Sequence, residues 1–117
     1  MSDSITAEKS MEFAVRIVNA GKYLMQNKKE FILSKQLIRS GTSIGANVAE
    51  AQRGQSKADF AAKMNIALKE ANETEYWLKL LHRTDYLDSG QYESLRKDTT
   101  EILAILTVIC RTTNTTK

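Results

Sequence analysis

Few side chains in this chain of 117 residues are suited to catalysis or metal binding. It has one histidine, His82, and one cysteine, Cys110. A di-iron carboxylate site in a helical bundle needs Glu-x-x-His on two helices, but the residue three before His82 is Lys79. Cys110 lies among apolar residues, which raise the pKa of a thiol and make it inert. We therefore predict no catalytic residue, no metal site and no cofactor, and we expect a protein that is not an enzyme.

Gly41 and Gly45 raise the question of a phosphate-binding loop. Such a loop follows a strand and ends in Lys-Ser/Thr, and neither feature is present here. The two glycines fall inside a helical pattern instead, where each costs roughly 0.5–1 kcal/mol relative to alanine. This cost predicts a neighbouring backbone packed very close to Gly41, Gly45 and Ala49.

Asn47 and Glu50 belong to a polar flank of the same helix, beside its apolar seam. In the structural interpretation, which we favour, they bond neighbouring helix ends or arginines across a helix pair and so fix the register. In the functional interpretation they contact a ligand or a partner. The remaining members of the flank are Gln36, Ser40 and Ser43.

A basic face is the one positive sign of RNA or DNA binding. It comprises Lys35, Arg39 and Arg53, opposite the apolar seam, and Lys57 beyond the following turn. A few phosphate contacts per subunit are weak, but a ring of subunits multiplies them through avidity. The alternative is an ordinary solvated face, and no aromatic residues are interleaved with these charges.

These residues are positioned by four amphipathic helices, predicted over residues 5–27, 31–53, 57–84 and 90–111. The chain has no proline and five glycines, and apolar residues recur at alternating spacings of three and four. Short connections between such helices favour an all-α, antiparallel, up-and-down four-helix bundle that forms a single domain over residues 1–117.

The helix ends have their own signals. Gly54 is predicted to end the second helix in a left-handed conformation, and Ser56 with Asp59 resembles a capping box that opens the third. Residues 112–117 are expected to fray. Ion pairs at i, i+4 are predicted on the helix surfaces: Glu12–Arg16, Asp59–Lys63, Glu75–Lys79 and Glu93–Lys97.

The third helix carries apolar side chains outside its core seam. Ile66, Trp77 and Leu80 share a second face, with Tyr76 behind them. Tryptophan and tyrosine are enriched in subunit interfaces, so we predict an oligomer interface here. The alternative is a core that extends past the seam.

The overall composition limits the classes of function. The chain has 17 basic and 14 acidic residues and a formal net charge of +3, which permits a nucleic-acid partner only if the charges cluster. The single cysteine excludes an internal disulfide and fits a reducing compartment. The chain opens on a polar segment, and its longest apolar run is too short to span a bilayer. We expect a cytoplasmic protein with no membrane partner.

Several segments carry a family resemblance: Ser43-Ile-Gly-Ala-Asn-Val-Ala-Glu-Ala51, Ser56-Lys-Ala-Asp-Phe60, Ile66-Ala-Leu-Lys-Glu-Ala-Asn-Glu73 and Tyr76-Trp-Leu78. They resemble a bacterial four-helix-bundle family encoded in intervening sequences of 23S rRNA genes and catalogued as a ribosomal protein family. The resemblance covers nearly the whole chain and implies a homopentamer with no known catalysis. The accessory variability protein of diversity-generating retroelements is similar too, and is a basic pentamer that binds nucleic acid and a reverse transcriptase. The label "ribosomal" reflects gene location.

The sequence thus predicts a non-enzymatic, homo-oligomeric helical bundle that acts as a binding or scaffold protein. Its expected partners are further copies of itself and RNA or DNA, with a second protein as an additional partner. The alternative is a protein–protein adaptor or structural subunit with no nucleic-acid contact.

Overall fold

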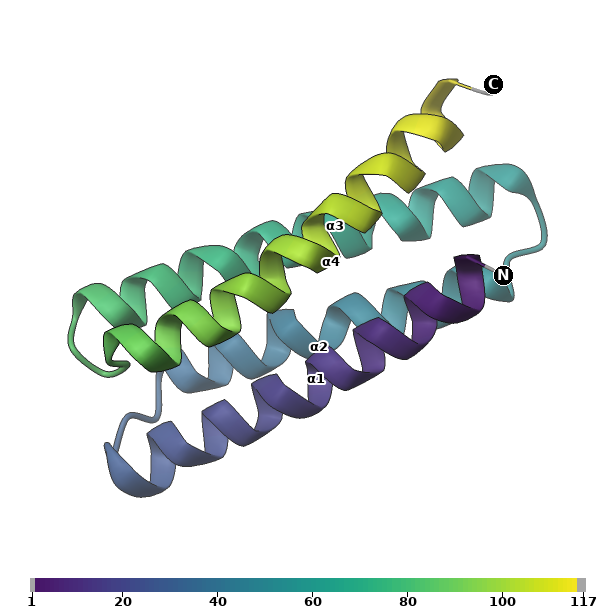
Figure 1. The fold of residues 1–117 in the computed structure, drawn as a ribbon. Helices are drawn as coiled ribbons and strands as arrows, with labels where there is room; N and C mark the ends of the chain where they lie inside the picture. The colour runs from purple at the N-terminus through teal and green to yellow at the C-terminus, as the bar shows by residue number, and fades with distance from the viewer. Residues whose placement is uncertain (1, 116–117) are drawn as a thin grey trace.

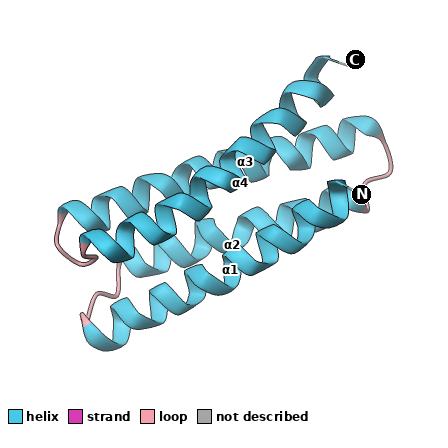
Figure 2. Cartoon of the chain, in the orientation of Figure 1, coloured by secondary structure: helices cyan, strands magenta, loops and turns pink. Residues whose placement is uncertain are grey.

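The computed structural model describes the backbone of residues 2–115 and the side chains of residues 5–114. Four helices make up nearly all of this part of the chain: α1 (Ser2–Asn27), α2 (Leu33–Gln52), α3 (Lys57–Arg83) and α4 (Ser89–Thr115). They run up and down with short loops between them (Figures 1 and 2), and the described residues fill an elongated shape of 46 × 21 × 20 Å. The predicted all-α four-helix bundle is confirmed.

The outer ends of α1 and α4 extend past their predicted limits. The expected fraying of residues 112–117 is wrong as far as Thr115, and the last two residues lie outside the described part. Threonine hydroxyls bond back to the helix, from Thr112 to the carbonyl of Val108 (3.0 Å) and from Thr113 to that of Cys110 (3.1 Å). These local hydrogen bonds occupy carbonyls near the end of the helix.

The core follows the predicted apolar seams. Each helix contributes fully buried side chains at spacings of three and four, as expected for helices that bury one stripe. The largest of them are Ile17, Leu24, Leu37, Ile44, Met64, Leu78, Leu81 and Leu106.

The contact between α1 and α2 is an interlock of glycines and isoleucines. A Cβ atom on Gly41 would lie 2.6 Å from Cγ2 of Ile17, and one on Gly21 would overlap the end of Ile38. Gly45 faces backbone, with the carbonyl oxygen of Ser10 at 3.4 Å from a Cβ placed there. The predicted close approach is therefore present at Gly41 and Gly45, although at Gly41 the neighbour is a side chain and not a backbone. At Ala49 the prediction is wrong, because this residue is exposed.

The turn after α2 differs from the prediction at Gly54, whose φ angle is not positive. The N–H of Arg53 and that of Gly54 bond the carbonyls three residues back, at 3.1 and 3.0 Å, which closes the helix without a left-handed residue. Glycine serves here by its small size, because a Cβ would lie 3.3 Å from the N atom of Phe60. The Ser56 cap is confirmed: its hydroxyl accepts from the N–H of Asp59 at 3.0 Å.

The ion pairs predicted at i, i+4 are not the ones that form among the described side chains. Basic residues mostly reach a neighbouring helix instead, since adjacent helices of a bundle bring many more carboxylates within range. The bridges join Lys9 to Glu101 (3.1 Å), Arg16 to Asp98 (2.6 Å), Lys63 to Glu50 (2.8 Å) and, within α4, Arg96 to Glu93 (2.8 Å).

Candidate nucleic-acid interface

The turn between α1 and α2 is closed by hydrogen bonds that fix its shape. The carbonyl of Leu24 accepts from the N–H groups of Lys28 and Glu30, both at 3.1 Å, and Lys29 takes the left-handed conformation with φ of 56°. The Glu30 carboxylate then accepts from the N–H groups of Ile32 (3.1 Å), Leu33 (2.9 Å) and Ser34 (2.7 Å). Glu30 therefore satisfies three backbone donors at the start of α2.

This environment changes the acidity of Glu30. Burial alone would raise the pKa of the carboxyl, but the N–H groups of Leu33, Ser34 and Ile32 and the hydroxyl of Ser34 stabilise the carboxylate. The net effect lowers the pKa below its ordinary value of 4.5. Glu30, the only acid of this turn, is therefore charged at neutral pH. Its carboxylate is occupied by the N–H groups at the start of α2.

The excess positive charge of the chain is concentrated around this turn. Residues 22–40 contain four lysines and one arginine against the single acid Glu30, a net charge of +4. The other 98 residues contain 12 basic and 13 acidic residues, a net charge of −1. The net charge of +4 at this end of the α1–α2 hairpin thus exceeds the net charge of +3 of the whole chain.

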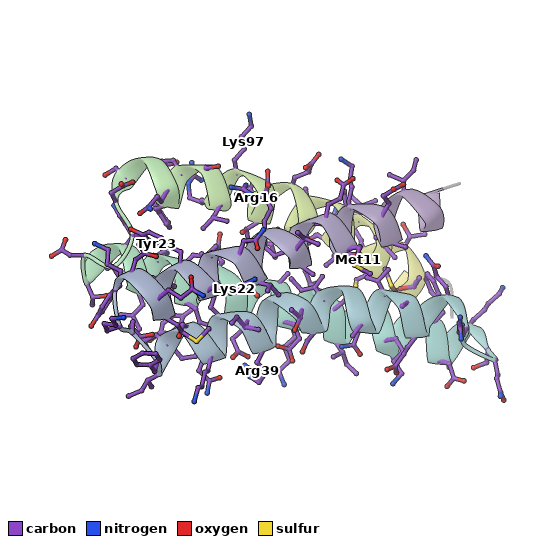
Figure 3. The ribbon with its side chains drawn as sticks, turned by 90° about the horizontal axis from the view of Figure 1, so that it is seen from below. Met11, Arg16, Lys22, Tyr23, Arg39 and Lys97 are labelled. Carbon is purple, nitrogen blue, oxygen red and sulfur yellow. The ribbon has the colours of Figure 1, made fainter. Side chains whose placement is uncertain are left out.

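The four lysines of this segment, Lys22, Lys28, Lys29 and Lys35, form what we call the hairpin lysines. All four are exposed, and none forms an ion pair with the described side chains. In Figure 3, Lys22 lies on the side of the bundle formed by α1 and α2. Charges that are exposed and unpaired are the ones available to phosphate groups.

Arg39, by contrast, is occupied by carboxylates of α3. Its guanidinium pairs with Glu70 at 3.3 Å and, still more closely, with Glu73. Its Nε also donates to Gln36 at 3.1 Å, and the indole N–H of Trp77 donates to Glu73 at 3.0 Å. The positive charge predicted at Arg39 is therefore balanced across the α2–α3 contact.

The structure does not bring the four predicted basic residues together. Lys35 is in the first turn of α2, whereas Arg53 follows its end and Lys57 begins α3. Eighteen residues of helix separate Lys35 from Arg53 by about 27 Å. Arg53 and Lys57 are both exposed and lie at the other end of the bundle, next to the exposed acids Glu50 and Asp59.

The family-motif residues of α2 have structural contacts. The side-chain amide of Asn47 donates to the carbonyl of Ser43 on its own helix at 2.8 Å, so the predicted hydrogen bond to another helix end is wrong. Glu50 does reach across to α3, where its partner is Lys63 and not an arginine. Ser40, on the same flank, is fully buried and accepts from the hydroxyl of Thr74 at 2.9 Å.

The predicted interface residues of α3 differ in exposure. Ile66 is 40% exposed and Tyr76 58% exposed. Trp77 and Leu80 are half-buried, and Trp77 packs against the core. The rings of Tyr76 and Trp77 meet edge to face at 5.1 Å. This face thus contains an extension of the core, with exposed apolar surface above it, and the predicted oligomer interface stays a prediction.

The residues first considered for chemistry remain apart. His82 stacks on Tyr92 with ring centroids 4.4 Å apart, and Cys110 is buried, which raises the pKa of its thiol. Within residues 5–114 no group of three or more His, Cys, Asp or Glu side chains is arranged to hold a metal ion. In the same part of the chain, no helix has the length and apolar character needed to cross a membrane.

Comparison with known proteins settles the family. The family model described as "23S rRNA-intervening sequence protein" matches residues 2–108. The chain belongs to this family. It is also similar to a solved protein of unknown function from the S23 ribosomal protein family of Bacteroides thetaiotaomicron, with 59% identity and a TM-score of 0.92. The match covers 95% of this chain and 99% of the other.

The comparisons leave the activity open. Among curated proteins, no significant match is found. The predicted family is confirmed, while the similarity to the accessory variability protein stays a prediction. Nothing in the family or in its solved member points to catalysis.

Sequence reasoning on single helix faces missed most of the hairpin lysines. Lys22, Lys28 and Lys29 lie on α1 and its turn, whereas the predicted basic face was confined to α2 and the residue after its turn. A running sum of charge along the chain would have found them, because no other segment of similar length has so many bases against a single acid.

Proposed function

We propose that this protein is a non-catalytic, self-associating scaffold that binds RNA or DNA through the hairpin lysines. One observation carries the proposal: Lys22, Lys28, Lys29 and Lys35 are exposed and unpaired within the described side chains, while the rest of the chain is close to neutral. When a nucleic acid binds such a cluster, it releases the counterions held around its phosphates. The free energy of this counterion release dominates non-specific nucleic-acid binding.

Arg53 and Lys57 are a second, smaller contact in this proposal. They stand at the opposite end of α2, so one subunit would touch a long strand at two places. Arg39 contributes least, because Glu70 and Glu73 already neutralise its guanidinium.

Self-association would place several hairpin ends in one particle. The exposed parts of Ile66 and Tyr76, with Trp77 and Leu80 beneath them, are the surface we assign to it. Linked weak sites act together, so a ring of subunits, a pentamer by family resemblance, would bind a strand far more tightly than one subunit.

The nucleic-acid part is tested by measuring affinity for a fluorescent RNA strand at increasing salt. The proposal expects log K to fall linearly with log salt, with a slope of about −0.7 for each phosphate contacted on a single strand. An adaptor that contacts proteins alone would leave the fluorescence anisotropy of the strand unchanged at every salt concentration.

The self-association part is tested by sedimentation of Ile66→Glu, chosen because Ile66 is more exposed than Trp77 and its loss should spare the core. We expect a smaller particle with unchanged helicity. The matched control is Val108→Glu on α4, where the original side chain is 59% exposed. If Ile66→Glu keeps the oligomer mass of the wild type while Val108→Glu dissociates, the interface lies on α4. This result would contradict the assignment to α3.

A further inference from the structure

An aromatic side chain stands among the hairpin lysines. Phe31 is 50% exposed and Ile32 is 76% exposed, directly after Lys28, Lys29 and the buried Glu30. Large apolar residues at the tip of a turn lose the hydrophobic stabilisation that burial would give them. The turn does not need them for its shape, since backbone groups and the Glu30 carboxylate supply its hydrogen bonds.

From this arrangement we propose that the hairpin end binds single-stranded nucleic acid, with an unpaired base stacked on Phe31 and neighbouring phosphates held by Lys28, Lys29 and Lys35. The inference rests on the proposed nucleic-acid function and narrows it to one form of the ligand. Stacking on aromatic rings beside a basic groove is the usual way in which proteins hold single strands without reading their sequence.

The spacing along the chain fits this role. Phe31 is two residues from Lys29 and four from Lys35, so ring and cations lie within one turn and the first residues of α2. Consecutive Cα atoms are about 3.8 Å apart, which keeps Lys29 and Phe31 within about 8 Å of each other. A single nucleotide that stacks on the ring therefore has cationic side chains within reach of its phosphates.

The rigid turn adds to the binding. Lys29 in the left-handed region and the carboxylate of Glu30 on three N–H groups hold the backbone on both sides of Phe31. A ring that is already positioned loses less conformational freedom when a base stacks on it.

A duplex fits this end less well, because its bases are paired and only its ends expose a ring face for stacking. A flat anionic membrane also fits less well. The α3–α4 turn lies at the same end of the bundle (Figure 1) and carries the exposed acids Asp85 and Asp88. A flat surface approaching end-on would meet these carboxylates, whereas a flexible strand can follow α1 and α2 alone.

The test compares three probes of equal length: an oligothymidylate, the same strand with abasic sites, and a blunt hairpin duplex. For wild-type protein we expect the oligothymidylate to bind most tightly. Phe31→Ala should weaken its binding at least about fivefold, the smallest effect of one lost stack, and should leave abasic-strand binding unchanged. Phe31→Tyr, which keeps the ring, should retain wild-type affinity.

Ile32→Ala is the matched control, since it removes exposed apolar surface from the same turn without removing a ring. We expect it to bind all three probes like the wild type. Melting curves of each variant check the fold, which these exposed positions should not disturb.

The outcomes separate the two proposals. Salt-sensitive binding in which abasic and thymidylate strands are equal and Phe31→Ala has no effect would overturn the stacking inference and leave the lysine interface standing. No binding of any probe would overturn both. Binding to phosphatidylserine vesicles that Phe31→Ala and Ile32→Ala weaken equally, with no preference for bases, would replace the strand by a lipid surface.

Discussion

The two sides of α2 contact their neighbouring helices through different kinds of interaction. Toward α1 the contact is steric, with Gly41 receiving Ile17 and Gly21 receiving Ile38. Toward α3 the apolar core contact is joined at its exposed edge by ion pairs, with Arg39 on Glu70 and Glu73 and with Glu50 on Lys63.

The ion pairs also determine where free charge remains. Lys35 and Arg39 lie one turn apart on the same face of α2, yet Arg39 pairs with Glu70 and Glu73 of α3 while Lys35 has no carboxylate partner among the described side chains. Lys22, Lys28 and Lys29 likewise form no ion pair with the described side chains. A basic residue in a sequence becomes a binding group only if the fold leaves it unpaired.

The largest effect should come from filling the interlock. Gly41→Ala places a Cβ within 3 Å of the buried Ile17 side chain, and the strain should outweigh the gain in helix propensity, for a net loss of about 2 kcal/mol in the free energy of unfolding. The matched control is Gly45→Ala, where the new Cβ meets Ser10 at 3.4 Å and should change stability by less than about 1 kcal/mol. Urea unfolding measures both, and equal effects would contradict a steric lock centred on Gly41.

The next effect concerns the buried carboxylate that opens α2. Glu30→Gln keeps an acceptor but loses the negative charge on three N–H groups, so we expect a loss of about 1.5 kcal/mol at pH 7. Because the folded pKa lies below the ordinary 4.5, the stabilising term is complete above that pH and disappears as the pH falls through the folded pKa. Urea unfolding of both proteins at pH 7 and at successively lower pH should show the gap closing, and a gap independent of pH would refute the role of the charge.

The smallest effect should come from the ion pairs toward α3. Arg39→Ala removes ion pairs in which Arg39 is 46% exposed, so its cost should stay below about 1 kcal/mol and shrink further at high salt. Lys35→Ala, on the same helix and without such a pair, serves as the control and should cost almost nothing. A loss at Arg39 as large as that at Gly41 would mean that ion pairs, and not packing, hold α2 in place.

Much of the fold was predictable because periodic apolar residues determine helices and their buried faces. The seams through Ile17, Ile44 and Leu78 are in the sequence and in the core alike. Ser56 as a helix cap was likewise readable from local spacing. The conformation of Gly54 was not, since a helix can also end through bonds three residues back.

The candidate site was less accessible to sequence reasoning. The pairing of Arg39 with Glu70 joins residues 31 apart in the chain, and only the packing of α2 on α3 determines it. Gly41 and Gly45 are marked by their spacing of four, whereas Gly21 is the single glycine of α1 and no second small residue at that spacing points to its contact with Ile38. The hairpin lysines come from two helices and a turn, so no single helical wheel displays them together.

The central claim is that free positive charge at the hairpin end, and not total charge, binds nucleic acid. The most direct measurement compares two triple variants with equal charge loss: Lys28, Lys29 and Lys35 to Gln, and Lys69, Lys79 and Lys97 to Gln. The second set is also exposed but lies on α3 and α4, and Figure 3 places Lys97 on the far edge from α2. Affinity for an RNA strand is measured against salt for both variants and the wild type.

The account predicts that the hairpin variant loses most of its affinity and that its salt slope flattens by about 2, the loss of three phosphate contacts. The control variant should keep nearly the wild-type slope. Equal losses in the two variants would show that net charge alone attracts the strand, and would contradict an interface at the α1–α2 turn.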